Sequence, residues 1–334
     1  MTNKDCAPFP NPELTAAAAA DFLTRMLMIR RAELKIEELY PLEQMKTPVH
    51  LSLGQEAVSA GVCMHLNRDD AVFSNHRSHG HYLAKGGSLK ELIAELYCRE
   101  TGCSKGRGGS MHVIAKDAGH WGSSSIVAGA TPHAVGAALA FQMQKKNAVA
   151  VCFLGDGACE QGVFFESMNW AALKKVPVVF VIENNFYSVS SHISVREVNE
   201  FLYKRAWAFD IPSFRVDGMN PLDVYASAAE AVEHARSGKG PFVVEYVLQR
   251  WRMHVGPGDP NAALYRAPEE LQAGYQRDPI KEFVEHVLTA GILKEQEIAQ
   301  ISSRVDGEVE EAFVFAQNSP LPDGGDLAKF LFVD

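Results

Sequence analysis

The segment that decides the fold reads VAVCFLGDG at residues 149–157 and ends in VPVVFVIENN at residues 176–185. Residues 149–154 and 176–182 are almost continuously apolar, which is typical of strands buried on both faces of a parallel sheet. Residues 160–174, between them, carry apolar side chains at helical spacing, so a strand–helix–strand unit with a right-handed crossover is expected. Asp156 and Asn185 are therefore expected at the carboxyl ends of strands in one sheet, the edge where open α/β folds bind ligands.

A carboxylate, an amide oxygen and nearby glycines at one sheet edge suit a hard divalent cation. Mg²⁺ takes about six oxygen ligands and is commonly shared between protein and substrate phosphates. Gly155 and Gly157 let backbone N–H groups approach a phosphate. A dinucleotide or P-loop motif fits poorly, because the next glycine is Gly162 and no Lys-Ser or Lys-Thr follows. An isolated Asp-Gly turn is common, so the prediction of a metal site depends on the joint pattern with the paired asparagines.

These asparagines follow Asp156 by 28 and 29 positions, which is the spacing of the thiamine diphosphate (ThDP) motif. The chain resembles the alpha subunit of ThDP-dependent 2-oxo acid dehydrogenases, the decarboxylating first component of those complexes. Other matching segments, in order, are HLSLGQEA at 50–57, NHRSHGH at 75–81, GCSKGRGGSMH at 102–112 and SSIV at 124–127. The resemblance runs from about residue 20 to residue 260. It implies a doubly wound α/β fold with a mostly parallel sheet, the diphosphate-binding half of a ThDP-binding fold.

The resemblance also implies roles for individual residues. Mg²⁺ would be bound by Asp156, the Asn185 side chain and the Tyr187 carbonyl oxygen. Arg77, Arg250 and His254 would hold diphosphate oxygens, and the catalytic candidates are His50, His79 and His254. The remaining cofactor-binding candidates are His76, Ser125, Val127, Gly155, Gly157, Ala158 and Gln161.

The chain departs from the family pattern at three positions. His76 stands where many members have tyrosine, and Ser125 stands where members often have glycine. Val255 follows His254 where the family commonly has serine, so phosphorylation of that serine is not expected here. The role of Gly256-Pro257-Gly258-Asp259-Pro260 is left open.

The same residues also have less specific interpretations. A lone arginine is more often part of a surface ion pair, and a lone histidine is usually structural. Four histidines within 32 positions beside Arg77 favour acid–base or anion-binding work. The sequence does not favour metal binding by these histidines, because they have no partnered cysteine or carboxylate pattern. The loop at residues 105–110 has the composition of a phosphate cradle, but in the family it shapes the active-site wall, so Lys105 and Arg107 are not assigned as ligands.

The 334 residues predict one main domain. Residues 1–14 are expected to form an extended arm, and residues 15–334 a single ThDP-binding α/β domain with a C-terminal helical segment. We expect a long helix at 15–40, a further strand at 241–248 and a helical hairpin from Pro279. The alternation of strands and helices argues for a doubly wound arrangement.

Composition limits the partners and the location. The net charge of −9 makes nucleic acid an unexpected partner. No apolar run approaches the length of a membrane span, and the N-terminus has no signal-like core, so a soluble, cytoplasmic protein is expected. The six cysteines are scattered without a CxxC pair and are expected to be reduced thiols.

The resemblance leaves one catalytic group to a second chain. In the split members of the family, the glutamate that activates the cofactor ring comes from a separate beta subunit. We therefore expect an alpha2beta2 assembly that acts on pyruvate or another small 2-oxo acid and passes the acyl group to a lipoyl-bearing acyltransferase. An acetoin-cleaving dehydrogenase is the alternative, because its alpha subunit often reads THRGHGH where this chain reads NHRSHGH. A non-catalytic structural partner is less well supported. A Mg²⁺-dependent phosphotransferase is also less well supported, because this chain lacks the motifs of that class of enzyme.

Overall fold

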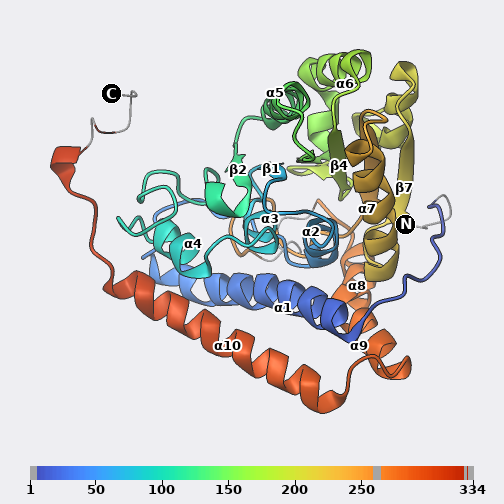
Figure 1. The fold of residues 1–334 in the computed structure, drawn as a ribbon. Helices are drawn as coiled ribbons and strands as arrows, with labels where there is room; N and C mark the ends of the chain where they lie inside the picture. The colour runs from blue at the N-terminus through green and yellow to red at the C-terminus, as the bar shows by residue number, and fades with distance from the viewer. Residues whose placement is uncertain (1–5, 259–264, 327–328, 330–334) are drawn as a thin grey trace.

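A central parallel sheet organises the chain. The computed structural model describes residues 6–258, 265–326 and 329. In this part of the chain a six-stranded sheet has the order β2-β1-β3-β4-β8-β7, and every neighbouring pair is parallel (Figure 1). Its strands are β1 Ala71–Ser74, β2 His120–Ser123, β3 Ala150–Gly155, β4 Val178–Asn184, β7 Ser213–Asp217 and β8 Phe242–Val247. A small antiparallel pair, β5 Tyr187–Ser188 and β6 Ser191–His192, follows β4. The predicted fold class is confirmed.

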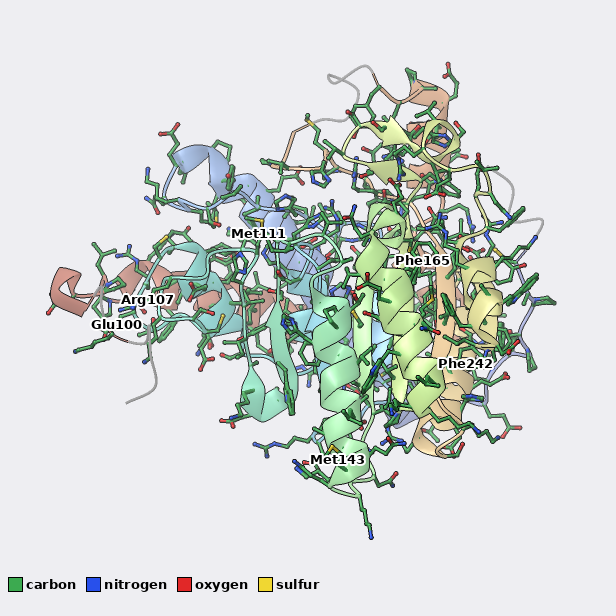
Figure 2. The ribbon with its side chains drawn as sticks, turned by 90° about the horizontal axis from the view of Figure 1, so that it is seen from above. Glu100, Arg107, Met111, Met143, Phe165 and Phe242 are labelled. Carbon is green, nitrogen blue, oxygen red and sulfur yellow. The ribbon has the colours of Figure 1, made fainter. Side chains whose placement is uncertain are left out.

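Helices cover both faces of this sheet. The α-helices of the described residues are α1 Ala16–Leu39, α2 Glu56–Cys63, α3 His79–Ala84, α4 Leu89–Leu96, α5 Ala130–Met143, α6 Gly162–Lys174, α7 Pro221–Arg236, α8 Pro268–Gln276, α9 Pro279–Thr289 and α10 Glu295–Asn318. Figure 2 shows α5 and α6, the helices that carry Met143 and Phe165, lying side by side over one face. On the other face α2 and α7 pack together, and α1 packs on α2 and α3.

The apolar run of β3 explains the two layers. Alternate side chains of a strand point to opposite faces. Val151 and Phe153 belong to the core under α2 and α7, whereas Ala150, Cys152 and Leu154 belong to the core under α5 and α6. All five are at most 1% exposed, so both faces of this strand are buried, as its composition predicts.

The strand–helix–strand unit is confirmed, but the helix begins later than expected. A 3₁₀ turn spans Asp156–Glu160, and α6 starts at Gly162 rather than at Glu160. Gln161 separates them because its backbone is extended, with φ −79° and ψ 137°. The predicted long helix is also confirmed, since α1 begins after Thr15, whose side-chain oxygen accepts from the Ala18 N–H at 3.2 Å.

The expected helical hairpin at the C-terminal end is wrong. The helix α10 packs along α1 and α4 instead of folding back chiefly on α9 (Figure 1). Its buried face, Ile301, Val305, Val309, Ala312, Phe313 and Ala316, recurs at intervals of three or four residues. This stripe runs from residue 301 to residue 316, so α10 needs a long partner such as α1.

The N-terminal segment runs outside the helices and strands. Residues 6–15 have neither helix nor strand, and the Ala7 N–H donates to the Arg215 carbonyl oxygen of β7 at 2.8 Å. Phe9 packs edge-on against Phe214 with ring centroids 5.2 Å apart. Residues 1–5 lie outside the described residues, and the domain boundary at residue 14 stays a prediction. No helix in the described ranges combines the length and the apolar character needed to span a bilayer.

Candidate functional site

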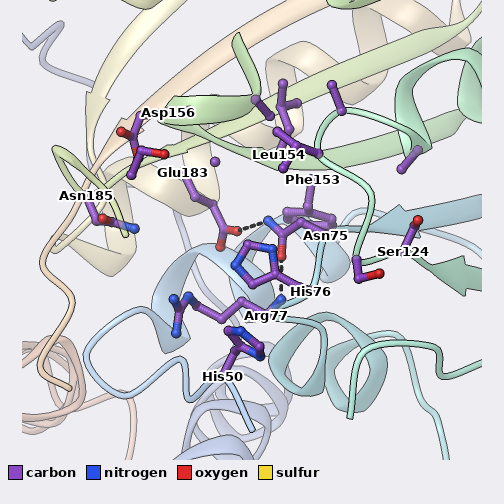
Figure 3. Close-up of a pocket in the computed structure, with 18 of the residues that line it drawn as sticks. His50, Asn75, His76, Arg77, Ser124, Phe153, Leu154, Asp156, Glu183 and Asn185 are labelled. Carbon is purple, nitrogen blue, oxygen red and sulfur yellow. Dashed lines mark hydrogen bonds between the residues drawn. The ribbon is translucent and has the colours of Figure 1, made fainter. Parts of the chain in front are cut away.

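A pocket opens at the carboxyl edge of the sheet, where the loops after β1, β2, β3, β4 and β8 meet (Figure 3). The strand order places β1 between β2 and β3, so the chain leaves β1 in one direction and β3 in the other. Such a reversal opens a crevice at the strand ends. Thirteen of the residues expected from the sequence line this pocket: His50, His76, Arg77, Ser125, Val127, Gly155, Asp156, Gly157, Ala158, Asn185, Tyr187, Arg250 and His254.

The predicted metal ligands lie at the ends of β3 and β4. Asp156 is 2% exposed and forms an ion pair with Arg196, which also forms an ion pair with Glu160. Burial raises the pKa of the Asp156 carboxyl, and Arg196 opposes that rise. A cation at Asp156 would therefore have to share the carboxylate with Arg196 or displace it. The Tyr187 hydroxyl donates to Glu270 at 2.8 Å.

Only one of the paired asparagines lines the pocket. The Asn184 amide donates to Glu245 at 2.7 Å beneath the sheet edge, so this side chain is structural. Asn185, the next residue, lines the pocket because its side chain lies on the other side of the chain. Its side-chain oxygen accepts from the Tyr187 N–H at 3.3 Å, which fixes the turn after β4.

Close packing explains one of the two glycines of the Gly-Asp-Gly motif. A Cβ atom on Gly157 would lie 2.5 Å from the Ser188 hydroxyl oxygen, so the turn after β3 can approach the β5 segment only with glycine here. A Cβ atom on Gly155 would meet no atom within 4 Å. Gly155 therefore leaves open space at the pocket rather than relieving a clash.

Two arginines give the pocket a buried positive charge. Arg77 is 5% exposed and Arg250 is 1% exposed, and neither forms an ion pair with a carboxylate of the described residues. Burial lowers the pKa of both guanidinium groups, and the charge of Arg250 lowers that of Arg77 further, to about 9. The Arg250 Nη1 is buried without a hydrogen-bond partner among these residues. Buried, unpaired guanidinium groups are strongly destabilising, so the pocket is suited to an anion such as a diphosphate.

Three of the predicted histidines meet beside these arginines. Ring centroids of His50, His76 and His254 are 4.7 to 5.1 Å apart. Burial, and then the charge of Arg77, lowers their pKa values to about 3, 2 and 4. A histidine that is ionised at pH 7 needs a pKa near neutrality or above. These rings are instead neutral at pH 7 and can act as hydrogen-bonding groups until an anion enters.

These lowered pKa values predict an acid-sensitive fold. Unfolded histidine takes up a proton near pH 6.5, whereas the folded rings do so only below about pH 4, so the unfolded state binds more protons between these values. The free energy of unfolding is therefore expected to fall as the pH is lowered from 7 to 4.5. Replacing His76 by Tyr should reduce the slope by up to about 1.4 kcal/mol per pH unit below pH 6. Urea unfolding at several pH values measures this, and Ser125→Ala, which removes no titrating ring, should keep the wild-type slope.

Two predicted site residues lie outside the pocket lining formed by the described residues. His79 is fully buried behind it, with Nε2 2.8 Å from the Ser110 hydroxyl and Nδ1 3.3 Å from Glu33. This position suits a residue that holds the wall, because the ring has no exposed edge. Gln161 is exposed at the start of α6, where the extended backbone before the helix directs it away.

Sequence reasoning missed a polar network in the pocket floor. Glu183 lines the pocket, and its carboxylate lies 3.1 Å from His81 Nε2 and 3.4 Å from the Asn75 amide nitrogen (Figure 3). The Asn75 side-chain oxygen in turn accepts from the Arg77 N–H at 2.8 Å. The only sequence signal for Glu183 was a charged residue inside an apolar strand. Gln55, also missed, is 1% exposed, and both of its side-chain polar atoms lack a hydrogen-bond partner among the described residues.

The glycine-rich loop binds an internal carboxylate. Backbone N–H groups of Ser104, Gly106, Gly108 and Gly109 donate to the buried Glu95 at 2.7 to 3.0 Å. These donors form the kind of cradle that would hold a phosphate, but Glu95 already occupies it. The loop supplies Met111 to the pocket, so its contribution is to the wall.

Comparison with known proteins agrees with this geometry. A family model described as dehydrogenase E1 component matches residues 24–324. The alpha subunit of acetoin:2,6-dichlorophenolindophenol oxidoreductase from Bacillus subtilis is 37% identical over 321 residues, which cover 96% of this chain and 95% of that protein. The pyruvate dehydrogenase E1 component alpha subunit of Rhizobium meliloti is 39% identical over 303 residues, covering 90% of this chain and 86% of that protein. The corresponding subunit of Rickettsia bellii is 36% identical over 308 residues, covering 92% and 94%.

These matches extend over nearly the whole chain and include every segment that lines the pocket. They confirm the resemblance inferred from the motifs. The chain therefore belongs to the dehydrogenase E1 component family of thiamine-diphosphate-dependent oxidoreductases.

Proposed function

We propose that this chain is the alpha subunit of an E1 component that decarboxylates pyruvate or a similar small 2-oxo acid, using thiamine diphosphate and Mg²⁺. The observation that carries the proposal is the arrangement of charge in one pocket. Two buried arginines without a carboxylate partner among the described residues line it together with Asp156 and Asn185. A diphosphate bridged to Mg²⁺ satisfies both sets of groups.

In this proposal each group of the pocket has a separate task. Asp156, the Asn185 side chain and the Tyr187 carbonyl oxygen would hold Mg²⁺, with the Asp156 carboxylate either shared with Arg196 or released from it. Arg77, Arg250 and His254 hold the diphosphate oxygens. The chemistry that thiamine diphosphate would supply when bound here is a nucleophilic carbanion and a sink for the electrons of decarboxylation.

The histidines act beside the cofactor as neutral groups. His50 is buried, its Nδ1 has no partner among the described residues, and its low pKa keeps it unprotonated at pH 7. It can therefore exchange a hydrogen bond with a substrate oxygen and take up a proton once a carboxylate or diphosphate raises its pKa. His79, held by Ser110 and Glu33, keeps the wall of the pocket in position.

A second chain completes the proposed enzyme. Ile126 and Val127 line the pocket yet are 68% and 50% exposed, so the pocket is open on this side. We place the beta subunit and its activating glutamate here, in an alpha2beta2 assembly. A lipoyl-bearing acyltransferase as acyl acceptor and a cytoplasmic location remain predictions from the sequence.

Acetoin is the alternative substrate. His76 stands where many members of the family have tyrosine, and the relative from Bacillus subtilis is named for acetoin. The two functions share the pocket, the cofactor and the oxidoreductase class. They differ in whether carbon dioxide or a two-carbon carbonyl fragment leaves the substrate.

Calorimetric titration of ThDP with Mg²⁺ into the chain, alone and mixed with its candidate beta subunit, tests the proposal. Tight binding only in the mixture supports a shared site, whereas absence of binding in both rejects the catalytic function. Reduction of 2,6-dichlorophenolindophenol by the loaded mixture, with pyruvate and with acetoin, then separates the two substrates. Turnover of acetoin alone would contradict the decarboxylase assignment.

A further inference from the structure

Three histidines from distant parts of the sequence converge at one side of the pocket. His50, His76 and His254 each offer a ring nitrogen, and these nitrogens all lie within 4.8 Å of one another. In Figure 3, His50 and His76 lie next to Arg77 and apart from Asp156. We propose that the three histidines form a binding site for a transition-metal dication of the Zn²⁺ type, separate from the hard-cation site at Asp156.

The ring arrangement fits three ligands of one ion. The ring planes are inclined to one another by 59° to 82°, so they are not stacked and their edges can converge. Tetrahedral Zn²⁺ with Zn–N distances of about 2.0–2.1 Å places ligand nitrogens roughly 3.4 Å apart. The observed nitrogens lie within 4.8 Å of one another, so the rings must draw closer when an ion binds. Three histidines with a fourth, open position are an established zinc ligand set, so a cysteine or carboxylate ligand is not needed.

Two of the three rings have a nitrogen without a hydrogen-bond partner among the described residues. His50 is 5% exposed, and its Nδ1 is buried without a hydrogen-bond partner among the described residues. The Nδ1 of His254 is in the same state. Buried polar atoms are normally paired, and a metal ion is one partner that would satisfy both rings at once.

The backbone segments that carry the rings are tied together. Arg77 donates to the carbonyl oxygens of Leu51 and of His254, so one guanidinium group joins the two segments that hold His50 and His254. The Gly256 N–H donates to the Val49 carbonyl oxygen at 2.8 Å and adds a second link. The three ligands are therefore held near one another before any ion binds.

Charge and ligand type select the ion. Neutral imidazoles favour Zn²⁺, Co²⁺, Ni²⁺ and Cu²⁺ over Mg²⁺, which prefers oxygen ligands. Arg77 and Arg250 face the cluster and oppose any cation, so the site is weaker than an isolated three-histidine site. The same charges favour an anion, such as hydroxide or a phosphate oxygen, as the fourth ligand.

Metal at this site would compete with the cofactor. His254 is the residue that we assign to the diphosphate, so a bound ion removes one diphosphate ligand and fills the space beside Arg77. This consequence rests on the proposed function, whereas the binding of the metal itself does not.

Titration of the full chain with Co²⁺ alone, followed by visible absorption and calorimetry, tests the site. We expect about one equivalent with the spectrum of a tetrahedral nitrogen site, and competition by Zn²⁺. His76→Tyr removes one ligand but keeps a ring of the family type, and should weaken binding at least about tenfold and abolish that spectrum, since even outer-shell changes cost 10–100-fold. His50→Gln is a second ligand variant should the first fail to fold, with circular dichroism as the check.

Two controls locate the ion. Asp156→Ala should retain Co²⁺ binding, and so should His112→Ala, which removes an exposed histidine outside the pocket. Loss of binding in Asp156→Ala, or equal binding by the wild type and both ligand variants, would overturn the proposed site.

A second titration tests the competition. Zn²⁺ added first should raise the apparent ThDP dissociation constant of the wild type with its beta subunit, but not that of His76→Tyr. An unchanged constant in the Zn²⁺-loaded wild type would refute the competition. Failure of ThDP to bind the Zn²⁺-free mixture in the presence of Mg²⁺ would reject the proposed function, while the Co²⁺ titration would still decide the metal site.

Discussion

Replacing Asp156 by Ala is expected to weaken Mg²⁺-dependent ThDP binding by roughly 30- to 4000-fold while the chain stays folded. The range corresponds to the loss of about 2–5 kcal/mol when one charged partner of a buried contact is removed. Asp156 is the only carboxylate among the three proposed metal ligands, so its loss leaves the cation beside two arginines with neutral oxygens alone. Calorimetric titration with the beta subunit present measures the change.

Glu160, at the other end of the 3₁₀ segment that begins at Asp156, provides a matched control. Glu160 shares Arg196 with Asp156 but does not line the pocket among the described residues. Glu160→Ala should therefore bind ThDP and Mg²⁺ as the wild type does. If both variants lost affinity equally, Arg196 and its ion pairs would matter rather than metal ligation.

Stability gives an independent check on the same residue. Burial raises the pKa of Asp156, so the folded chain disfavours its charge, and this cost is present above the raised pKa and absent at acidic pH. Asp156→Asn keeps the shape and removes the charge. Its free energy of unfolding at pH 7 should equal or exceed that of the wild type, and a loss of stability would show that the pair with Arg196 holds the fold.

The sequence was sufficient to predict the centre of the sheet and one side of the site. Continuous apolar runs in residues 149–154 and 176–182 can be buried only in a parallel sheet covered on both faces, so the positions of Asp156 and Asn185 followed from local pattern. The boundaries shifted by one or two residues, because Gln161 interrupts the helical pattern without changing its apolar period. The long helix α1 was also predicted, within one residue at each end.

Contacts between distant segments could not be predicted in the same way. Residues 50, 76 and 254 lie on three loops, and only the tertiary packing of distant segments brings their ring nitrogens within 4.8 Å of one another. Arg196 reaches Asp156 from 40 positions away, and nothing in the local sequence assigns it a partner. The histidine pKa values also depend on burial, which a single sequence does not give.

The glycine-rich loop was open to two interpretations for the same reason. Its composition permits a phosphate cradle, and the structure shows the backbone donors turned towards a residue on α4. Gly106 and Gly109 have φ of +73° and +58°, which glycine alone adopts without strain, so the loop can wind its N–H groups around one point. The decisive residue was Glu95, a buried acid in an otherwise ordinary amphipathic helix.

Replacing Glu95 by Ala is accordingly expected to lower the free energy of unfolding by about 3–5 kcal/mol. Each of its two carboxylate oxygens accepts two backbone N–H groups, and all four donors lose their partner together. An unpaired buried donor costs about 1–3 kcal/mol, and relaxation of the loop towards water keeps the total below the full sum. Urea unfolding monitored by circular dichroism measures the change.

Two further variants decide whether the amide contacts cause the loss. Glu95→Gln keeps one acceptor oxygen of the two, so it should lose about half as much stability as Glu95→Ala. Glu100→Ala removes an exposed carboxylate close by and should change stability by less than about 0.5 kcal/mol. Because Met111 and Ser110 follow the loop, Glu95→Gln should also raise the apparent ThDP constant with its beta subunit present. A variant that lost stability but bound ThDP normally would show that the loop supports the fold without shaping the pocket.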